Sequence, residues 1–214
     1  MAQKNSENRF LIKKHTNVVE ISDISVNLNT CAGIDEVGRG PLAGPVVAAA
    51  VVLGDHHDWS ELTDSKKLTE KRREILCQEI KQHALAWSLG RCESSEIDQF
   101  NIFNASLLAM KRAFDSLSLK TDLAVVDGKY SPVLSVKSYA VIKGDLYVPA
   151  ISAASIIAKV TRDKEMCELD ASFPKYGFAK HKGYPTSFHV NALKQFGPCH
   201  HHRRSFKPVA ELLE

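Results

Sequence analysis

The chain has 214 residues, of which 44% are hydrophobic and 25% charged. This is the composition of an ordinary globular protein, and it excludes a disordered or collagen-like chain. The length allows one domain, or one with a small appendage, and a core that needs neither disulfides nor structural metal. The sequence has no secretory signal, and its longest uncharged stretch, residues 40–54, is too short to span a bilayer.

The cysteines are scattered, odd in number and without a C-x-x-C pair, which argues against a disulfide framework or a zinc ribbon. We therefore expect a protein of a reducing compartment, the cytoplasm, with no membrane association. The five cysteines are Cys31, Cys77, Cys92, Cys167 and Cys199.

The formal net charge of +3 is unevenly distributed along the chain. Residues 171–210 contain no Asp or Glu but seven Lys or Arg and five His, which leaves 21 basic against 25 acidic residues elsewhere. An acidic body with a basic C-terminal fifth indicates a polyanionic partner. The alternative is a basic face that is only solvated.

In the first half of the chain the residue pattern alternates between strand and helix. Residues 31–36 and 45–53 are predicted strands, the second with apolar residues on both faces, as in a buried strand. Residues 69–85 are predicted to be helical because Leu76, Ile80 and Ala84 share one face. Residues 86–92 form a third predicted strand.

The second half continues the alternation. A helix is predicted over residues 104–117, followed by strands at 123–127 and 138–142 and by a helix at 151–169 that is rich in small residues. After Pro174 come short basic segments separated by glycine and proline. The order of elements predicts an α/β fold with helices on both faces of a largely buried sheet.

Four acidic residues stand at the carboxyl ends of apolar strand patterns with glycine close by: Asp35, Glu36, Asp127 and Asp145. In open α/β sheets, ligands bind at the carboxyl ends of strands. Because adjacent strand residues point to opposite faces, Asp35 and Glu36 are expected to share a site only if the strand ends or kinks there.

Carboxylates that converge to about 5 Å repel one another by roughly 3 kcal/mol per pair at an effective dielectric near 20. Such a cluster must take up protons or bind cations. Oxygen ligands without His or Cys select Mg²⁺ or Mn²⁺, and two such ions can clamp a phosphate, one activating water and one stabilising the leaving oxygen. The alternative is that these acids only cap strands and improve solubility.

A glycine-rich loop, Gly38-Arg39-Gly40-Pro41-Leu42-Ala43-Gly44, follows the first strand. Its spacing is one residue too long for a dinucleotide fingerprint, and no phosphate-binding P-loop motif is present, so a nucleotide cofactor is a weak alternative. Beside an acidic cluster, the loop could let the backbone approach a sugar closely, or it could be a plain turn between strands.

Three further places attract attention. Ser65 and Lys66 precede the first long helix, where a helix cap or a phosphate contact is possible. Tyr184, between glycine and proline, can offer a ring face for stacking on a sugar or base, although an ordinary packed tyrosine fits as well. Consecutive residues 199–202, Cys-His-His-His, invite a zinc assignment, but neighbours in sequence rarely chelate one ion well.

Over residues 30–208 the sequence strongly resembles the type 2 ribonucleases H, the ribonuclease HII family. The signature is D-E-V-G-R-G-P-L-A-G-P-V-V-A-A-A-V at residues 35–51. Further matches follow in order: D-S-K-K-L (64–68), V-D-G (126–128), K-G-D (143–145), A-A-S-I-I-A-K-V-T-R-D (153–163), Y-G-F (176–178), H-K-G-Y-P-T (181–186) and H-R-R-S-F (202–206). The G-R-G form argues against the related type 3 enzymes.

The resemblance implies a ribonuclease H-like mixed sheet flanked by helices, plus a small C-terminal helical region. It divides the chain into an N-terminal extension of uncertain role (1–29), a catalytic domain (30–170) and a basic region that helps to bind substrate (171–214). The acidic site of the family maps onto Asp35, Glu36, Asp127 and Asp145. These carboxylates would hold Mg²⁺ or Mn²⁺.

The family's substrate contacts also map onto this chain. Gly38, Arg39 and Gly40 would read the ribose 2′-hydroxyl, Tyr184 would stack at an RNA–DNA junction, and Ser65 and Lys66 would contact phosphate. The resemblance implies cleavage of RNA in RNA–DNA hybrids and incision on the 5′ side of single ribonucleotides in duplex DNA, leaving 3′-hydroxyl and 5′-phosphate ends. A monomer is expected. The rivals are another two-metal nuclease or recombinase acting on plain DNA, and a basic nucleic-acid-binding module without chemistry.

Overall fold

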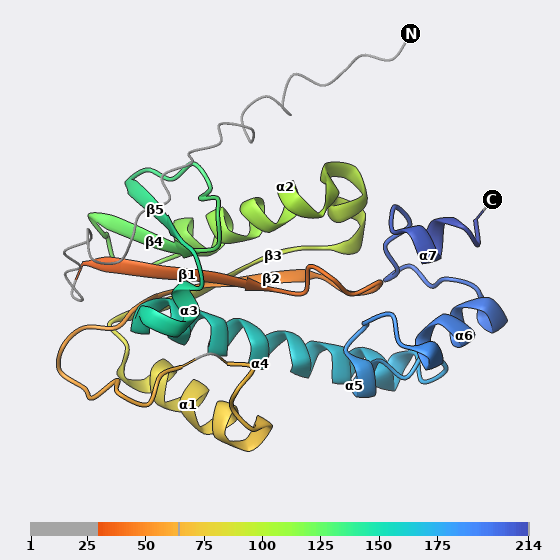
Figure 1. Cartoon of the computed structure of the whole chain (residues 1–214), viewed down its shortest axis with the longest axis horizontal. Coiled ribbons are helices and arrows are strands. Elements are labelled where there is room, and N and C mark those ends of the chain that lie inside the picture. The colour runs from red at the N-terminus through yellow and green to blue at the C-terminus, as the bar shows by residue number, and fades with distance from the viewer. Residues whose placement is uncertain (1–29, 64, 214) are drawn as a thin grey trace, which may run out of the picture.

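The computed structural model describes residues 30–63 and 65–213, so the N-terminal extension predicted for residues 1–29 lies outside the described residues. Within them, five strands form one mixed sheet with helices on both faces, which confirms the predicted α/β fold (Figure 1). The strands are β1 (Cys31–Val37), β2 (Val46–Val52), β3 (Ala86–Cys92), β4 (Leu123–Asp127) and β5 (Lys137–Val141).

The strand order across the sheet is β3-β2-β1-β4-β5. The first three strands form an antiparallel meander, whereas β1, β4 and β5 run parallel to one another. The parallel pairing of β1 with β4 ends at the pair Ile34↔Val126. Because β1 continues to Val37, its last residues lie beyond this pairing, and the sheet is open there between the two strands.

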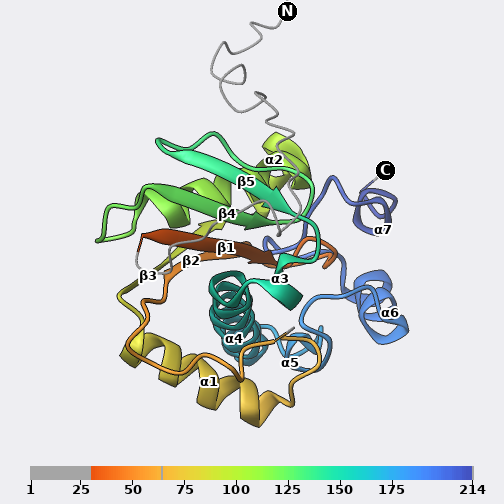
Figure 2. The same cartoon turned by 60° about the vertical axis from the view of Figure 1, so that its left-hand side comes forward.

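Two layers of helix cover one face of the sheet, and one layer covers the other. On one face the long helix α4 (Pro149–Ser172) lies directly against β1 and β2, and α1 (Glu70–His83) packs outside α4 (Figure 2). On the other face α2 (Ser94–Asp115) packs against β2 and β3. Nearly all residues of β1 and β2 are buried because a helix packs against each face of these strands.

Glycine allows two of these helices to approach the sheet closely. A Cβ built on Gly33 of β1 would lie 2.1 Å from the backbone carbon of Ala150 in α4. A Cβ on Gly90 of β3 would lie 2.1 Å from the carbonyl oxygen of Ala109 in α2. Both distances are far below van der Waals contact, so neither position accepts a side chain without displacing a helix.

The helix α2 is longer than the sequence pattern predicts. The pattern starts the helix at residue 104, whereas α2 starts at Ser94 and contains a kink at Asn101, whose φ of 64° is left-handed. The Asn101 side chain accepts hydrogen bonds from the backbone N–H groups of Phe103 and Asn104, as an N-cap does. Ile97 of the first segment is nevertheless buried in the same hydrophobic cluster as Ala105 and Met110 of the second.

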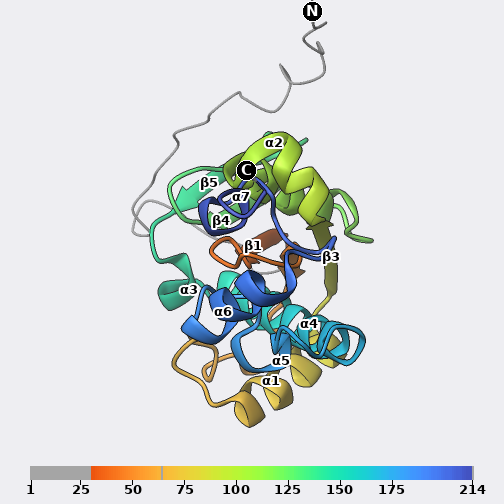
Figure 3. The same ribbon diagram turned by 90° about the vertical axis from the view of Figure 1, so that its right-hand side faces the viewer.

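A small helical region lies at one end of the molecule, as Figures 1 and 3 show. It has a core of its own, in which Phe178 and Leu193 are buried together with Leu42 from the loop between β1 and β2. This agrees with the small C-terminal helical region that the resemblance implies, although the residue pattern predicted only short segments here and not the ten-residue helix α6. The helices after α4 are α5 (Phe178–His181), α6 (Ser187–Phe196) and α7 (Lys207–Ala210).

The division of the chain at residues 170 and 171 stays a prediction. The helix α4 runs through this position to Ser172, and α3 (Gly144–Tyr147) links β5 to the start of α4.

Among the described residues, no helix is both long and apolar enough to cross a membrane.

Candidate active site

The four acidic residues singled out by the sequence stand at the carboxyl ends of the three parallel strands. Asp35 and Glu36 belong to β1, and Asp127 is the last residue of β4. Asp145 lies in α3, which follows β5 after two residues. Segments more than 100 residues apart thus meet at one edge of the sheet because parallel strands place equivalent ends side by side.

Asp35 and Glu36 reach the same site without a kink, contrary to the expectation from strand alternation. β1 is regular through Val37, where it still pairs with Val47 of β2. Its pairing with β4 has already ended at Ile34, however. The open space between the two strands therefore admits neighbouring side chains that a fully paired strand would send to opposite faces.

A cavity of about 240 Å³ brings most of the predicted site residues together. It joins residues from β1, from the end of β4, from the segment before α1, from α4 and from the loop between α5 and α6. Its lining consists of Asp35, Glu36, Val37, Ser65, Lys66, Asp127, Ser155, Lys159 and Tyr184. Carboxylates, two lysines and a half-exposed aromatic ring therefore face one space.

The remaining predicted residues surround this cavity. Asp145 does not line it, but its backbone N–H donates to Oδ1 of Asp127 at 3.4 Å. Arg39 lies in a smaller neighbouring hollow with Glu36 and Asp127, and its Nη1 is 3.4 Å from Oε1 of Glu36. Gly40 adjoins Tyr184, since a Cβ built there would lie 3.4 Å from the tyrosine ring.

The carboxylates perturb one another's titration. Burial, followed by the charges of Glu36 and Asp127, raises the pKa of Asp35 well above its ordinary value. Burial raises the pKa of Glu36 to about 7, against the opposing effect of the Arg39 guanidinium. Burial and the charge of Asp145 raise the pKa of Asp127. The four groups are thus one electrostatic unit, and at neutral pH the site is short of positive charge.

These residues fit hard divalent cations by their donor chemistry. As they stand, no three His, Cys, Asp or Glu side chains in residues 30–63 and 65–213 are grouped closely enough to hold one ion. A bound cation would relieve the mutual repulsion of the carboxylates. The donors are all carboxylate oxygens, which suit Mg²⁺ or Mn²⁺ and not zinc.

Sequence reasoning missed two residues of the cavity, Ser155 and Lys159. The Ser155 hydroxyl lies 2.9 Å from that of Ser65, and its hydrogen bond to Asp35 opposes the rise in that residue's pKa. Lys159 Nζ donates to Oδ1 of Asp163 at 2.7 Å. Ser155 and Lys159 are four residues apart on one face of α4, and this spacing inside the matched segment 153–163 is the signal that could have found them.

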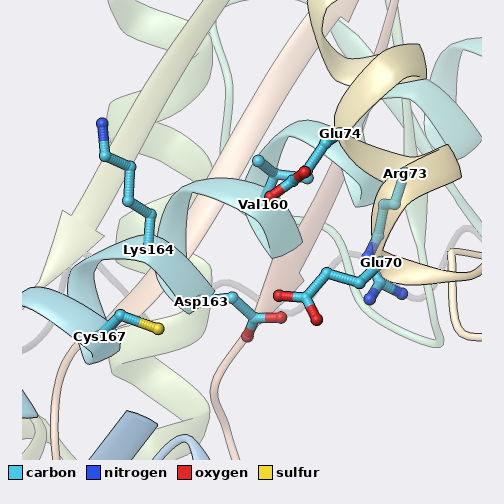
Figure 4. A pocket seen from close by; sticks show the side chains of 7 residues that line it. All are labelled: Glu70, Arg73, Glu74, Val160, Asp163, Lys164 and Cys167. Atoms are coloured by element: carbon cyan, nitrogen blue, oxygen red, sulfur yellow. The ribbon is translucent and has the colours of Figure 1, made fainter.

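A second hollow, of about 200 Å³, lies between α1 and α4 (Figure 4). Figure 4 shows the carboxylates of Glu70 and Asp163 pointing into the gap between the two helices. Two of its residues support the cavity described above: Asp163 pairs with Lys159, and Arg73 donates to the carbonyl of Ser65 at 2.6 Å. The residues around this hollow therefore support the wall of the candidate site from the outside.

The basic C-terminal region presents less charge than its sequence suggests. Burial lowers the pKa of His189 and of His202 to about 4, so both are neutral at physiological pH. Their Nε2 atoms are 3.0 Å apart, and His189 Nδ1 donates to the carbonyl of Tyr184 at 3.0 Å. These histidines fix the loop that carries Tyr184 and do not attract a polyanion. Arg203 is also buried.

Comparison with known proteins agrees with the fold and identifies the family. The profile of the Ribonuclease HII family matches residues 32–209. The chain is 59% identical over 182 residues to the ribonuclease HII of Aliivibrio fischeri strain MJ11, which covers 85% of this chain and 88% of that protein. The ribonuclease H2 of Pyrococcus horikoshii superposes with a TM-score of 0.71 at 27% identity, covering 86% of this chain and 96% of that one.

A further solved structure, the PCNA:RNase HII complex from Archaeoglobus fulgidus, superposes with a TM-score of 0.68 at 29% identity and covers 83% of this chain and 95% of that one. A mixed sheet with an acidic site at its parallel edge, together with these matches, defines a hydrolytic endonuclease of the ribonuclease H class that depends on divalent metal. Within that class, the chain belongs to the ribonuclease HII family.

Proposed function

We propose that this enzyme cleaves RNA in RNA–DNA hybrids and incises duplex DNA on the 5′ side of a single embedded ribonucleotide. The observation that carries the proposal is the shared cavity of Asp35, Asp127 and Tyr184, beside which lies the Gly38–Gly40 loop. A hydrolytic centre and a backbone loop able to approach a sugar are thus adjacent. Such a loop can distinguish ribose from deoxyribose through the 2′-hydroxyl.

In this mechanism Asp35, Glu36, Asp127 and Asp145 would hold two divalent ions, Mg²⁺ or Mn²⁺. Such ions would supply water activation for in-line attack and charge neutralisation on the leaving 3′-oxygen, which would give 3′-hydroxyl and 5′-phosphate ends. The hydrogen bond from the Glu36 backbone N–H, 2.7 Å from Asp35 Oδ1, orients the most buried carboxylate of the cavity. Ser155 holds that carboxylate from α4.

The substrate is positioned by groups around the acidic centre. Lys66 lines the cavity and offsets part of the charge on Asp127, so it is placed to meet a phosphate. Ser65 is buried and hydrogen-bonded to Ser155, so it supports the part of the cavity wall that would contact a phosphate. Arg39 extends from the loop with about half of its side chain exposed, and its guanidinium group offers several N–H donors. We infer that Arg39 holds the loop in place and contacts a phosphate of the substrate.

We also propose that the enzyme acts as a monomer in the cytoplasm. All five cysteines are free, and Cys31, Cys77 and Cys92 are buried, as suits a reducing compartment.

The direct test is a labelled duplex carrying one ribonucleotide, incubated with each divalent ion, beside its all-deoxy twin. We expect nicking of the first duplex only, on the 5′ side of the ribonucleotide, with 3′-hydroxyl and 5′-phosphate ends at the nick. Equal cutting of both duplexes would favour a nuclease of plain DNA. Tight binding without ion-dependent turnover would favour a binding module without chemistry.

Tyr184 is expected to contribute through its ring. The side chain is 43% exposed and lines the cavity, so a base or sugar can stack on it. Replacing Tyr184 by alanine should weaken binding of the ribonucleotide duplex by about ten- to a hundredfold, the 1–3 kcal/mol typical of base–aromatic stacking. Tyr184→Phe keeps the ring and should bind almost as the wild type does. Fluorescence anisotropy measures both, and similar losses in the two variants would exclude stacking.

A further inference from the structure

Two arginines among the residues that the structure describes are buried without a carboxylate in an ion pair. Arg162 of α4 and Arg203 of the C-terminal region are both fully buried. Among the described residues neither takes part in an ion pair. Burying an unpaired cation is costly, and a well-packed apolar side chain would avoid this cost. The two guanidinium groups therefore serve a purpose that an apolar side chain cannot.

Arg203 collects carbonyl groups from both ends of the loop between β1 and β2. Its Nη2 donates to Gly38 O at 2.6 Å, its Nη1 to Arg39 O at 3.0 Å, and its Nε to Gly44 O at 3.1 Å. The backbone N–H of Arg203 adds a bond to Leu42 O at 2.8 Å. A planar fork with five donors can span these carbonyls, whereas a lysine ammonium cannot.

The direction of these carbonyls determines where the loop's donors point. The described residues contain no cis peptide bonds, and in a trans peptide unit the C=O and the following N–H point in opposite directions. Since Gly38 O and Arg39 O turn toward the guanidinium group of Arg203, the N–H groups of Arg39 and Gly40 turn away from it. Gly40 adjoins the ring of Tyr184, which itself lines the acidic cavity.

Arg162 braces the same loop from the side of α4. It donates to Pro45 O at 2.9 Å and to Ala43 O at 3.1 Å, and it reaches Lys182 O, next to the Tyr184 loop, at 2.9 Å. It also explains why glycine stands at position 38. That residue has a φ of +94°, and a Cβ there would lie 2.3 Å from Arg162 Nε.

We propose that Arg203 is a positioning residue for ribonucleotide selectivity. Its guanidinium group turns the Gly38 and Arg39 carbonyls inward, and the N–H groups of Arg39 and Gly40 are thereby presented to the 2′-oxygen of the substrate sugar. This inference rests on the proposed function. A deoxyribose leaves those donors without a partner, a loss that corresponds to about ten- to a hundredfold in affinity.

The test compares Arg203→Lys with Arg204→Lys, the same change at the exposed neighbouring residue. For each protein, dissociation constants are measured in chelator, without cleavage, for the single-ribonucleotide duplex and for its all-deoxy twin. We expect the ratio of the two constants to fall about tenfold or more in Arg203→Lys and to stay at the wild-type value in Arg204→Lys. A merely structural role lowers the active fraction, which weakens both apparent affinities equally and leaves the ratio unchanged.

Wild-type selectivity in Arg203→Lys would overturn the inference, whatever happens to its overall affinity. If that variant does not fold, amide hydrogen exchange of the wild-type protein tests the inference instead. The Arg39 and Gly40 amides should exchange rapidly in the free protein and slowly only with the ribonucleotide duplex. Equal protection by both duplexes, or none by either, would overturn the inference. A wild type that does not distinguish the duplexes removes the proposed function itself.

Discussion

Replacing Asp35 by asparagine is expected to lower kcat for cleavage of a ribonucleotide-containing duplex by about a thousandfold or more. The change removes one negative charge and one ionised ligand from the centre of the acidic cavity while keeping the side chain's shape. Charge stabilisation by bound divalent ions is worth several kcal/mol in the transition state, and about 4 kcal/mol corresponds to three orders of magnitude in rate. Single-turnover kinetics at saturating enzyme separates this loss from weaker substrate binding.

The same substitution should make the metal-free protein more stable. Asp35 and Glu36 have raised pKa values in the folded state, the latter about 7. Groups of this kind contribute stability that is fully present at low pH and is lost as the pH rises through the folded-state pKa. In chelator, the wild-type Tm should therefore fall as the pH rises from about 4.5 to 7, the ordinary and the folded-state pKa of Glu36, and the Tm of Asp35→Asn should fall less.

Divalent ions should restore the wild-type Tm at pH 8 and leave that of the variant nearly unchanged, because binding only to the native state stabilises it. Asp115→Asn is the matched control, since Asp115 is an exposed residue of α2 paired with Lys111. It should keep wild-type activity. A catalytically active Asp35→Asn protein, or one that Mg²⁺ stabilises as it does the wild type, would rule out the metal role of Asp35.

Placing a methyl group on Gly33 is the second change with a large expected effect. A Cβ at this position meets the backbone of α4 at 2.1 Å, and backbone atoms cannot move aside as a flexible side chain can. We expect Gly33→Ala to lower the free energy of unfolding by about 3 kcal/mol or more. Urea denaturation followed by circular dichroism measures this loss.

Displacement of α4 should also reduce activity, because α4 carries Ser155 and Lys159 into the cavity on β1. Gly197→Ala is the matched control: a Cβ there meets nothing within 4 Å, and only its backbone conformation, with φ 69° and ψ 174°, opposes the change. Its cost should be about 1–2 kcal/mol, from backbone strain alone. Equal destabilisation by the two substitutions would show that close packing of α4 on β1 is not what position 33 protects.

Local periodicity predicted most of the fold well because these elements bury one face or both. The strands at residues 86–92 and 123–127 have the predicted bounds. The beginning of α2 was missed because the kink at Asn101 depends on hydrogen bonds from two later residues. The helix α6 was missed because glycine and proline on either side of it suggested only turns.

The sequence by itself determined which side chains are candidates for the chemistry, because carboxylates at strand ends and an ordered series of motifs are local features. Only the tertiary structure decided how these residues act together. Parallel pairing aligns the ends of β1, β4 and β5, and the early end of the β1–β4 pairing opens the cavity. The buried arginines could be read from the sequence only as positive charge, since their role depends on carbonyl groups more than 100 residues away that folding brings within hydrogen-bond distance.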